Sequence, residues 1–278
     1  MQEFVAACVQ MRSGRDVRAN LDACEVLVRE AAKDGAIYIQ TPEMTNVLER
    51  SREAQMAAVS SEVEDPFLAR MTKVAADLQI WLHLGSLAIR RDDGKLANRA
   101  FLLAPDGSVA ARYDKIHMFD VDLPDGESWR ESKTYEPGTT SPVVALPFTK
   151  IGLAICYDVR QPALFREQAK HGAQVLTAPA AFTRQTGRAH WHVLQRSRAI
   201  ENGAFVVSAA QGGVHEDGRE TYGHSLIVDP WGRVIGELDH DEPGVLLAEV
   251  RLKLSEDARA RVPAIANARG FSIEDVAL

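Results

Sequence analysis

The chain is poor in cysteine, in long apolar runs and in basic charge, and each shortage excludes a class of protein. Three of its 278 residues are cysteines, an odd number at wide spacing, which excludes a disulfide-stapled scaffold. No stretch reaches the roughly 20 apolar residues that cross a bilayer, and the first residues lack the basic and apolar parts of a signal peptide. Its 39 acidic residues outnumber 32 basic ones, which argues against nucleic acid or an anionic membrane as a partner. We therefore expect a cytoplasmic protein that acts on a small molecule.

The composition and the absence of internal boundaries favour one domain. With 46% hydrophobic residues over 278 positions, the sequence can bury a large core. No linker, repeat or low-complexity segment divides it, so we expect a single domain spanning residues 1–278. The last segment, 252–278, mixes charged and apolar residues, and we expect it to take part in a contact between subunits.

Apolar runs and helical spacings alternate along the chain, which indicates an α/β fold. The run 4–9, a helical pattern at 20–33 and a second run at 36–39 have the order of a strand–helix–strand unit. Further helices are expected at 64–78, 163–171 and 189–201. The remaining strands are expected at 80–89, 99–104, 109–113, 143–146, 151–155, 174–178, 204–209, 225–228 and 245–250. So many strands exceed one simple sheet, and two stacked sheets with helices outside accommodate them.

Cys156 stands where a strand is expected to turn into a helix. The apolar run 151–155 ends at this residue. Such a turn holds a nucleophile at the end of a rigid strand, and the next backbone N–H, that of Tyr157, is free to point at an oxyanion. The alternative is a buried structural cysteine, the commoner state of this residue type. We assign that state to Cys8 and Cys24, which lie within a strand and on a helix face.

Two charged residues complete a possible catalytic group. Glu43 follows the strand expected at 36–39, and Pro42 ends that strand, so the carboxylate is expected at the edge where α/β folds bind ligands. Lys115 lies among aromatic and apolar residues after another strand. Either residue alone is more commonly a solvated surface charge. With Cys156, however, they supply what amide cleavage needs: a thiolate to attack the carbonyl, a cation to hold the oxyanion and a carboxylate to move protons.

These three residues stand in motifs that resemble a known family. Glu43 in Pro-Glu, Lys115 in Asp-Lys-Ile-His-x-Phe-Asp and Cys156 in Gly-Leu-Ala-Ile-Cys-Tyr-Asp-x-Arg resemble the Glu-Lys-Cys triad of the nitrilase superfamily, the carbon-nitrogen hydrolases. The resemblance covers nearly the whole chain and implies a four-layer αββα sandwich that forms a homodimer. It also implies a fourth catalytic residue, Glu131, which keeps the lysine protonated. Glu131 lies in a polar loop at 120–141, long enough to suggest a function.

Downstream motifs resemble one branch of that family. Ala-Pro-Ala-Ala-Phe ending at Phe182 and Tyr-Gly-His-Ser from Tyr222 are similar to the Nit subgroup of small amidases. Ala-Ala-Gln-x-Gly ending at Gly213 is closer to the deaminated glutathione amidases than to the ω-amidases, which act on α-keto amides. Gln161 departs from the phenylalanine that the family often has at this place, which leaves the pocket wall and the substrate open.

The resemblance implies hydrolysis of a non-peptide amide through a thioester. Cys156 attacks the amide carbon and Glu43 moves the protons. Lys115 and the backbone N–H of Tyr157 hold the oxyanion, and no metal or organic cofactor is required.

Substrate contacts are expected after the strand at 174–178. Phe182 and Arg184 follow this strand, and we expect both to contact the substrate. An arginine such as Arg184, Arg160 or Arg188 has the geometry to hold a substrate carboxylate through two hydrogen bonds.

Four alternatives stay open. An ω-amidase would hydrolyse an α-keto amide by the same chemistry. An N-acyltransferase would pass the same thioester to an amine, and a non-catalytic scaffold would retain only the fold. A papain-like hydrolase would use His117, His190 or His224 as its base. His190 and His192, two apart on a helix, face different directions, so we expect no metal between them.

Overall fold

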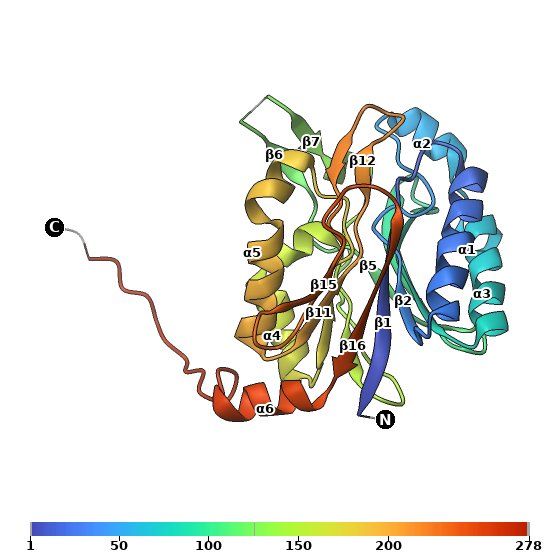
Figure 1. Ribbon diagram of the computed structural model, residues 1–278. Coiled ribbons are helices and arrows are strands. Elements are labelled where there is room, and N and C mark those ends of the chain that lie inside the picture. The colour runs from blue at the N-terminus through green and yellow to red at the C-terminus, as the bar shows by residue number, and fades with distance from the viewer. Residues whose placement is uncertain (1, 125, 277–278) are drawn as a thin grey trace.

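Two stacked sheets form the centre of the molecule (Figure 1). The computed structural model describes residues 2–124 and 126–276. Each sheet has six described strands, in the order β16-β1-β2-β3-β4-β5 and β15-β14-β11-β10-β9-β8. In each, three parallel neighbours (β1-β2-β3 and β9-β10-β11) are flanked by antiparallel strands.

The strands of the two large sheets have the following bounds. The first sheet contains β1 Glu3–Gln10, β2 Tyr38–Gln40, β3 Trp81–Arg90, β4 Leu96–Leu103, β5 Val109–Asp114 and β16 Gly244–Arg251. The second contains β8 Val143–Ala145, β9 Lys150–Gly152, β10 Val175–Thr177, β11 Phe205–Ser208, β14 Leu226–Val228 and β15 Val234–Glu237. Two hairpins stand apart: β6 Asp120–Asp122 with β7 Ser128–Arg130, and β12 Gly212–Val214 with β13 Glu220–Tyr222.

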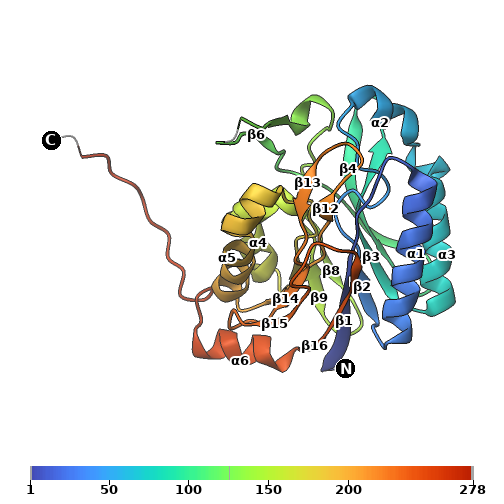
Figure 2. The same ribbon diagram turned by 45° about the horizontal axis from the view of Figure 1, so that its top comes forward.

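Helices cover both outer faces of the sheet pair. Helices α1 (Val17–Lys33) and α3 (Pro66–Leu78) lie over the first sheet, and α4 (Pro162–Lys170) and α5 (Arg184–Asn202) lie over the second (Figures 1 and 2). The predicted four-layer αββα sandwich is therefore confirmed. The short helix α2 spans Arg52–Ala58 and α6 spans Lys253–Arg261. Within the described residues, no helix has both the length and the apolar character needed to span a membrane.

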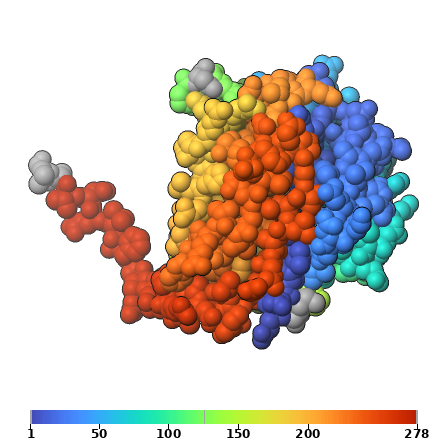
Figure 3. Space-filling view, in the orientation of Figure 1, coloured from blue at the N-terminus to red at the C-terminus, as the bar shows by residue number. Residues whose placement is uncertain are grey.

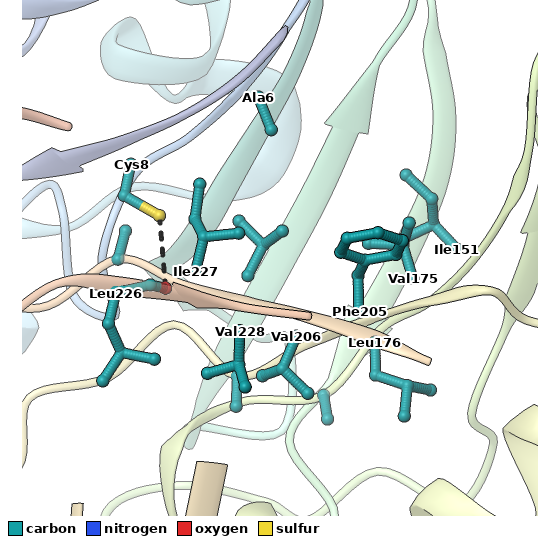
Figure 4. Close-up of a cluster of buried hydrophobic side chains, with 14 of the residues drawn as sticks. Ala6, Cys8, Ile151, Val175, Leu176, Phe205, Val206, Leu226, Ile227 and Val228 are labelled. Carbon is teal, nitrogen blue, oxygen red and sulfur yellow. Dashed lines mark hydrogen bonds between the residues drawn. The ribbon is translucent and has the colours of Figure 1, made fainter. Parts of the chain in front are cut away.

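Strand β1 shows how the sequence pattern builds these layers. Alternate residues of a strand point to opposite faces of its sheet. Phe4, Ala6 and Cys8 join the core between the two sheets, whereas Ala7 and Val9 join the core beneath α1 and α3. Figure 4 shows Ala6 and Cys8 on the side of β1 that faces the second sheet. A strand buried on both faces reads as a continuous apolar run, as this one does.

Local signals set the helix ends. The carboxylate of Asp16 accepts hydrogen bonds from the first turn of α1, and Asp65 does the same for α3, which has proline at its first position. Helix α5 begins earlier than the predicted 189–201, because the side chain of Thr183 caps it and starts the helix at Arg184. Gly203, with a φ of 53°, ends it.

The strand predicted at 151–155 is shorter than expected. Only its first residues pair with a neighbour, because β9 ends at Gly152. Beyond that point the backbone N–H of Leu153 donates to Pro142, and the N–H of Cys156 donates to Pro179. The last part of the apolar run is therefore extended but is held by loops.

The predicted polar loop at 120–141 contains regular structure. It holds the β6–β7 hairpin and a 3-10 turn, Glu131–Lys133. At the top of Figure 1, this hairpin lies in the same region as β12 and α2. These elements, although short, surround the end of the sheet pair where the site is found.

The C-terminal segment leaves the body of the protein after α6. Figure 3 shows it as an arm that projects from the rest of the surface. Phe271 and Ile273 on this arm are 85% and 79% exposed. The structure holds a single chain, so the predicted subunit contact of this segment stays a prediction.

Candidate active site

Cys156 begins a tight turn after β9. It is the first residue of the 3-10 turn Cys156–Arg160, and its φ of 49° lies in the left-handed region that non-glycine residues rarely adopt outside constrained sites. Its backbone N–H donates to the carbonyl of Pro179 at 2.9 Å. The carboxylate of Asp158 accepts from the N–H of Ile155 at 2.8 Å. These hydrogen bonds thus hold the backbone of the turn that carries the thiol.

Glu43 lies in the turn that follows β2 and is 4% exposed. The next residue, Met44, has a φ of 54° and donates its backbone N–H to Ser86 Oγ at 2.9 Å. The side-chain amide of Gln211 donates to the Glu43 carbonyl at 3.0 Å, and the backbone N–H of Ala181 donates to Glu43 Oε2 at 2.9 Å. The side chains of Ser86 and Gln211 therefore hold the turn, and a backbone N–H holds the carboxylate.

Lys115 follows β5, and its ammonium lies between two carboxylates. Its Nζ donates to Glu43 Oε1 at 2.9 Å and to Glu131 Oε2 at 2.8 Å, and its side chain is 2% exposed. The backbone N–H of Phe119 donates to Glu131 Oε2 at 2.7 Å. Asn98 Nδ2 bridges the same two carboxylates, 2.9 Å from Glu43 Oε1 and 3.0 Å from Glu131 Oε1. Two donors and two carboxylates thus form a closed ring.

This ring determines the resting charges. Burial raises the pKa of Glu43, but Lys115 and the neighbouring hydrogen-bond donors together outweigh burial, so the pKa lies below its usual range. Burial lowers the pKa of Lys115, but Glu131 and Glu43 raise it well above its ordinary value. Burial and the negative Glu43 raise the pKa of the Cys156 thiol. At rest the site therefore contains a carboxylate, an ammonium and a protonated thiol.

The four side chains line one pocket of about 300 Å³. Tyr157 and Phe182, predicted to contact substrate, also line it. Arg184 and Gln161 are absent from the described lining, and the guanidinium of Arg184 instead forms ion pairs with Glu220 and Asp241. The structure thus brings six of the seven predicted site residues together and leaves Arg184 outside.

The histidines considered as the base of a papain-like hydrolase lie outside the described pocket lining. His117 Nδ1 is 2.7 Å from Asp158 Oδ1, His190 is bonded to Arg160, and the ring of His224 stacks on Tyr222. None of these histidines is in the pocket lining that the described residues form. His192 contacts Glu237, so it and His190 face different partners, as predicted from their spacing.

Sequence reasoning missed several residues of the pocket. Arg50, Trp129 and Arg219 line its wall, and the guanidinium carbons of both arginines lie within 5 Å of the Trp129 ring centroid, at 4.7 and 4.4 Å. Trp129 stands two residues before Glu131, which was a usable signal. No sequence signal pointed to Arg219, because only the packing of the β12–β13 hairpin brings it to the site.

Comparison with known proteins supports the same assignment. The family model for carbon-nitrogen hydrolases matches residues 5–260. A deaminated glutathione amidase of Synechocystis sp. is 38% identical over 273 residues, which cover 95% of this chain and 98% of that protein. The NitFhit protein of C. elegans superposes with a TM-score of 0.91 at 33% identity, over 97% of this chain and 66% of that one.

A further solved structure bears on the cysteine. An amidase from Nesterenkonia sp. AN1, with acrylamide added to its active-site cysteine, has a TM-score of 0.78 and 28% identity, over 94% of this chain and 98% of that one. The fold, the matched family and these relatives agree. The chain therefore belongs to the carbon-nitrogen hydrolase family and, within it, to the cysteine-dependent amidases.

Proposed function

We propose that this amidase hydrolyses deaminated glutathione through a thioester on Cys156. The observation that carries the chemistry is the Glu43 carboxylate, which accepts a hydrogen bond from the Lys115 ammonium and lines the same pocket as Cys156. The substrate follows from the relatives that carry this name and from the cations of the pocket. Deaminated glutathione has a keto group in place of its amino group, so it carries carboxylates and no ammonium.

The first half of the reaction forms the thioester. Glu43 takes the proton of the Cys156 thiol, and the sulfur attacks the amide carbon. The Lys115 ammonium and the backbone N–H of Tyr157 stabilise the negative oxygen of the tetrahedral intermediate. The protonated Glu43 then gives its proton to the departing amine, and the carbon–nitrogen bond breaks.

The second half releases the acid. Glu43, again a carboxylate, takes a proton from water, which attacks the thioester carbonyl. The same donors hold the second oxyanion. When it collapses, the carbon–sulfur bond breaks, and Glu43 gives its proton to the sulfur to restore the thiol. Glu131, 2.8 Å from Lys115, keeps the lysine protonated through both halves.

Arg160 is the cation best placed for the carboxylate of the acyl group. It lies in the same turn as Cys156, lines the pocket and is free of ion pairs with the described carboxylates. The geometry therefore favours Arg160 over Arg184 as the residue that orients the acyl half. Loss of this contact by Arg160→Gln raises KM for every substrate with that acyl group.

The test uses two amides with the same acyl group. Purified protein is incubated with deaminated glutathione or with α-ketoglutaramate, and release of cysteinylglycine or ammonia is measured. Intact-mass spectra report the acyl adduct on Cys156, with Cys156→Ala as the control. Preference for α-ketoglutaramate would identify an ω-amidase. Transfer of the acyl group to an added amine would identify an acyltransferase. Absence of any adduct would indicate a non-catalytic protein.

We also propose that the protein works as a homodimer in the cytoplasm. The exposed apolar residues of the C-terminal arm are suited to contact a second copy. All three cysteines are free and buried, which suits a reducing compartment.

A further inference from the structure

Five basic side chains line the pocket, and two of them lack a close carboxylate partner. Three are paired at 2.8 Å: Lys115 with Glu131, Arg50 with Glu127 and Arg130 with Asp122. Arg160 forms no ion pair with any carboxylate of the described chain. Arg219 reaches only Asp217, at 3.6 Å, too far for a hydrogen bond. The pocket thus offers two cations to an anionic ligand.

Arg219 is the more unusual of the two, because one N–H of its guanidinium group is buried without a hydrogen-bond partner among the described residues. Its side chain is 16% exposed, and its Nε is buried with no partner among the described residues. Its guanidinium lies 4.4 Å from the ring centroid of Trp129, whose own Nε1 is also buried and without a partner there. Burial lowers the pKa of Arg219. Two buried N–H groups without acceptors are costly, and a bound anion offsets that cost.

Arg160 and Arg219 belong to different parts of the pocket. Arg160 lies in the turn of the nucleophile, over the rings of Tyr157 and Phe182 at 5.7 and 5.3 Å. Arg219 comes from the β12–β13 hairpin and packs on Trp129 of the β6–β7 hairpin. The acyl group stays on the nucleophile after the bond breaks, so Arg160 is on the acyl side. Arg219 is therefore the cation that can contact the departing amine.

Building on the proposed function, we infer that Arg219, with the indole N–H of Trp129, binds a carboxylate on the amine side of the scissile bond. In deaminated glutathione this group is the glycyl carboxylate. The α-keto amides with ammonia as leaving group have no such group. Arg219 is then the residue by which this site selects a peptidyl amide over a primary amide.

The experiment compares two substrates that share an acyl group. In Arg219→Gln we expect the ratio of kcat/KM for deaminated glutathione to kcat/KM for α-ketoglutaramate to fall about 10- to 100-fold, through a higher KM for deaminated glutathione. Arg160→Gln lowers both values and changes the ratio little. Arg233→Gln, which removes the same charge from an exposed turn, controls for net charge.

A substrate change provides a second readout on the unaltered protein. The glycyl methyl ester of deaminated glutathione lacks the second carboxylate, so wild-type enzyme should hydrolyse it about 10- to 100-fold less efficiently than the acid. Arg219→Gln should treat acid and ester alike. If the wild type hydrolyses acid and ester equally well, the inferred role of Arg219 is wrong. The same holds if Arg219→Gln leaves the ratio of the two kcat/KM values unchanged. Either result leaves the proposed function intact. Wild-type enzyme that hydrolyses neither amide overturns the proposed function and this inference with it.

Discussion

The hydroxyl of Tyr113 donates a 2.6 Å hydrogen bond to Oδ2 of Asp158. Tyr113 belongs to β5 of the first sheet and stands two residues before Lys115, whereas Asp158 stands two residues after Cys156 in the turn beyond β9. The same carboxylate oxygen accepts the backbone N–H of Ile155. This contact therefore sets the position of the ammonium relative to the thiol.

Replacing Tyr113 by phenylalanine should lower kcat about 10-fold or more, because loss of the bond lets the two segments shift. Tyr38→Phe is the matched control, since it removes a buried hydroxyl that is bonded to His83 at 2.8 Å. Both variants should lose about 1 to 3 kcal/mol of unfolding free energy in urea. Equal kcat values for the two variants would mean that the Tyr113 bond serves stability alone.

Removing the bridge at Asn98 should change the pH dependence of the reaction. The Asn98 amide stabilises the charged form of Glu43, so Asn98→Leu should raise the pKa of this carboxylate. Glu43 must be deprotonated to act, hence the acidic limb of the kcat/KM profile should move to higher pH while the alkaline limb stays. An acidic limb that does not move would show that Asn98 has no influence on the base.

His83 should make the protein less stable in acid. Its Nδ1 accepts from Tyr38 and Gln40, and burial lowers the pKa of His83 to about 3. The unfolded chain, with a pKa of about 6.5, binds the proton more tightly, so this contribution is complete above that pH and is lost as the pH falls toward the folded value. Between pH 7 and pH 5 the loss is about 2 kcal/mol. Urea titrations should show a smaller loss in His83→Asn, and equal losses would exclude His83 as the cause.

Gly85 permits close approach of the segments that hold Glu43 and Cys156. A Cβ at this position would overlap the Thr41 carbonyl and lie 2.5 Å from Cβ of Pro179, the residue whose carbonyl accepts the Cys156 N–H. Gly85→Ala should therefore cost about 1 to 3 kcal/mol and also lower kcat. Gly270→Ala, at an exposed position with open space and, like Gly85, without a positive φ, gives a reference for the backbone effect alone. Full activity in Gly85→Ala would contradict this role.

The C-terminal arm should support the dimer. Replacing Phe271 and Ile273 by serine removes two exposed apolar side chains and should shift the protein toward monomer in sedimentation velocity. Val63→Ser changes a residue that is 94% exposed on another face and should leave the sedimentation coefficient unaltered. A monomeric wild type, or a double variant that stays dimeric, would disprove the contact.

The sequence predicted those parts of the site that depend on local order. Glu43 and Cys156 each follow an apolar run, so their places at the ends of strands could be inferred from neighbouring residues. Lys115 and Glu131 needed the family motifs, because nothing local distinguishes them from surface charges. Arg219 and Trp129 meet through two hairpins far apart in the chain, and the three-residue strands of those hairpins carry too little pattern to predict.

The nucleophile and its partners belong to different sheets. Cys156 follows a strand of the second sheet, whereas Glu43 and Lys115 follow strands of the first. The reacting atoms therefore keep their spacing only while the two sheets keep their alignment, and the side chains that set it are apolar, such as Ala6 and Cys8 facing Ile227 (Figure 4). A small displacement of one sheet relative to the other would therefore separate the thiol from the carboxylate and the ammonium. Such a displacement would stop catalysis even if every helix and strand stayed intact.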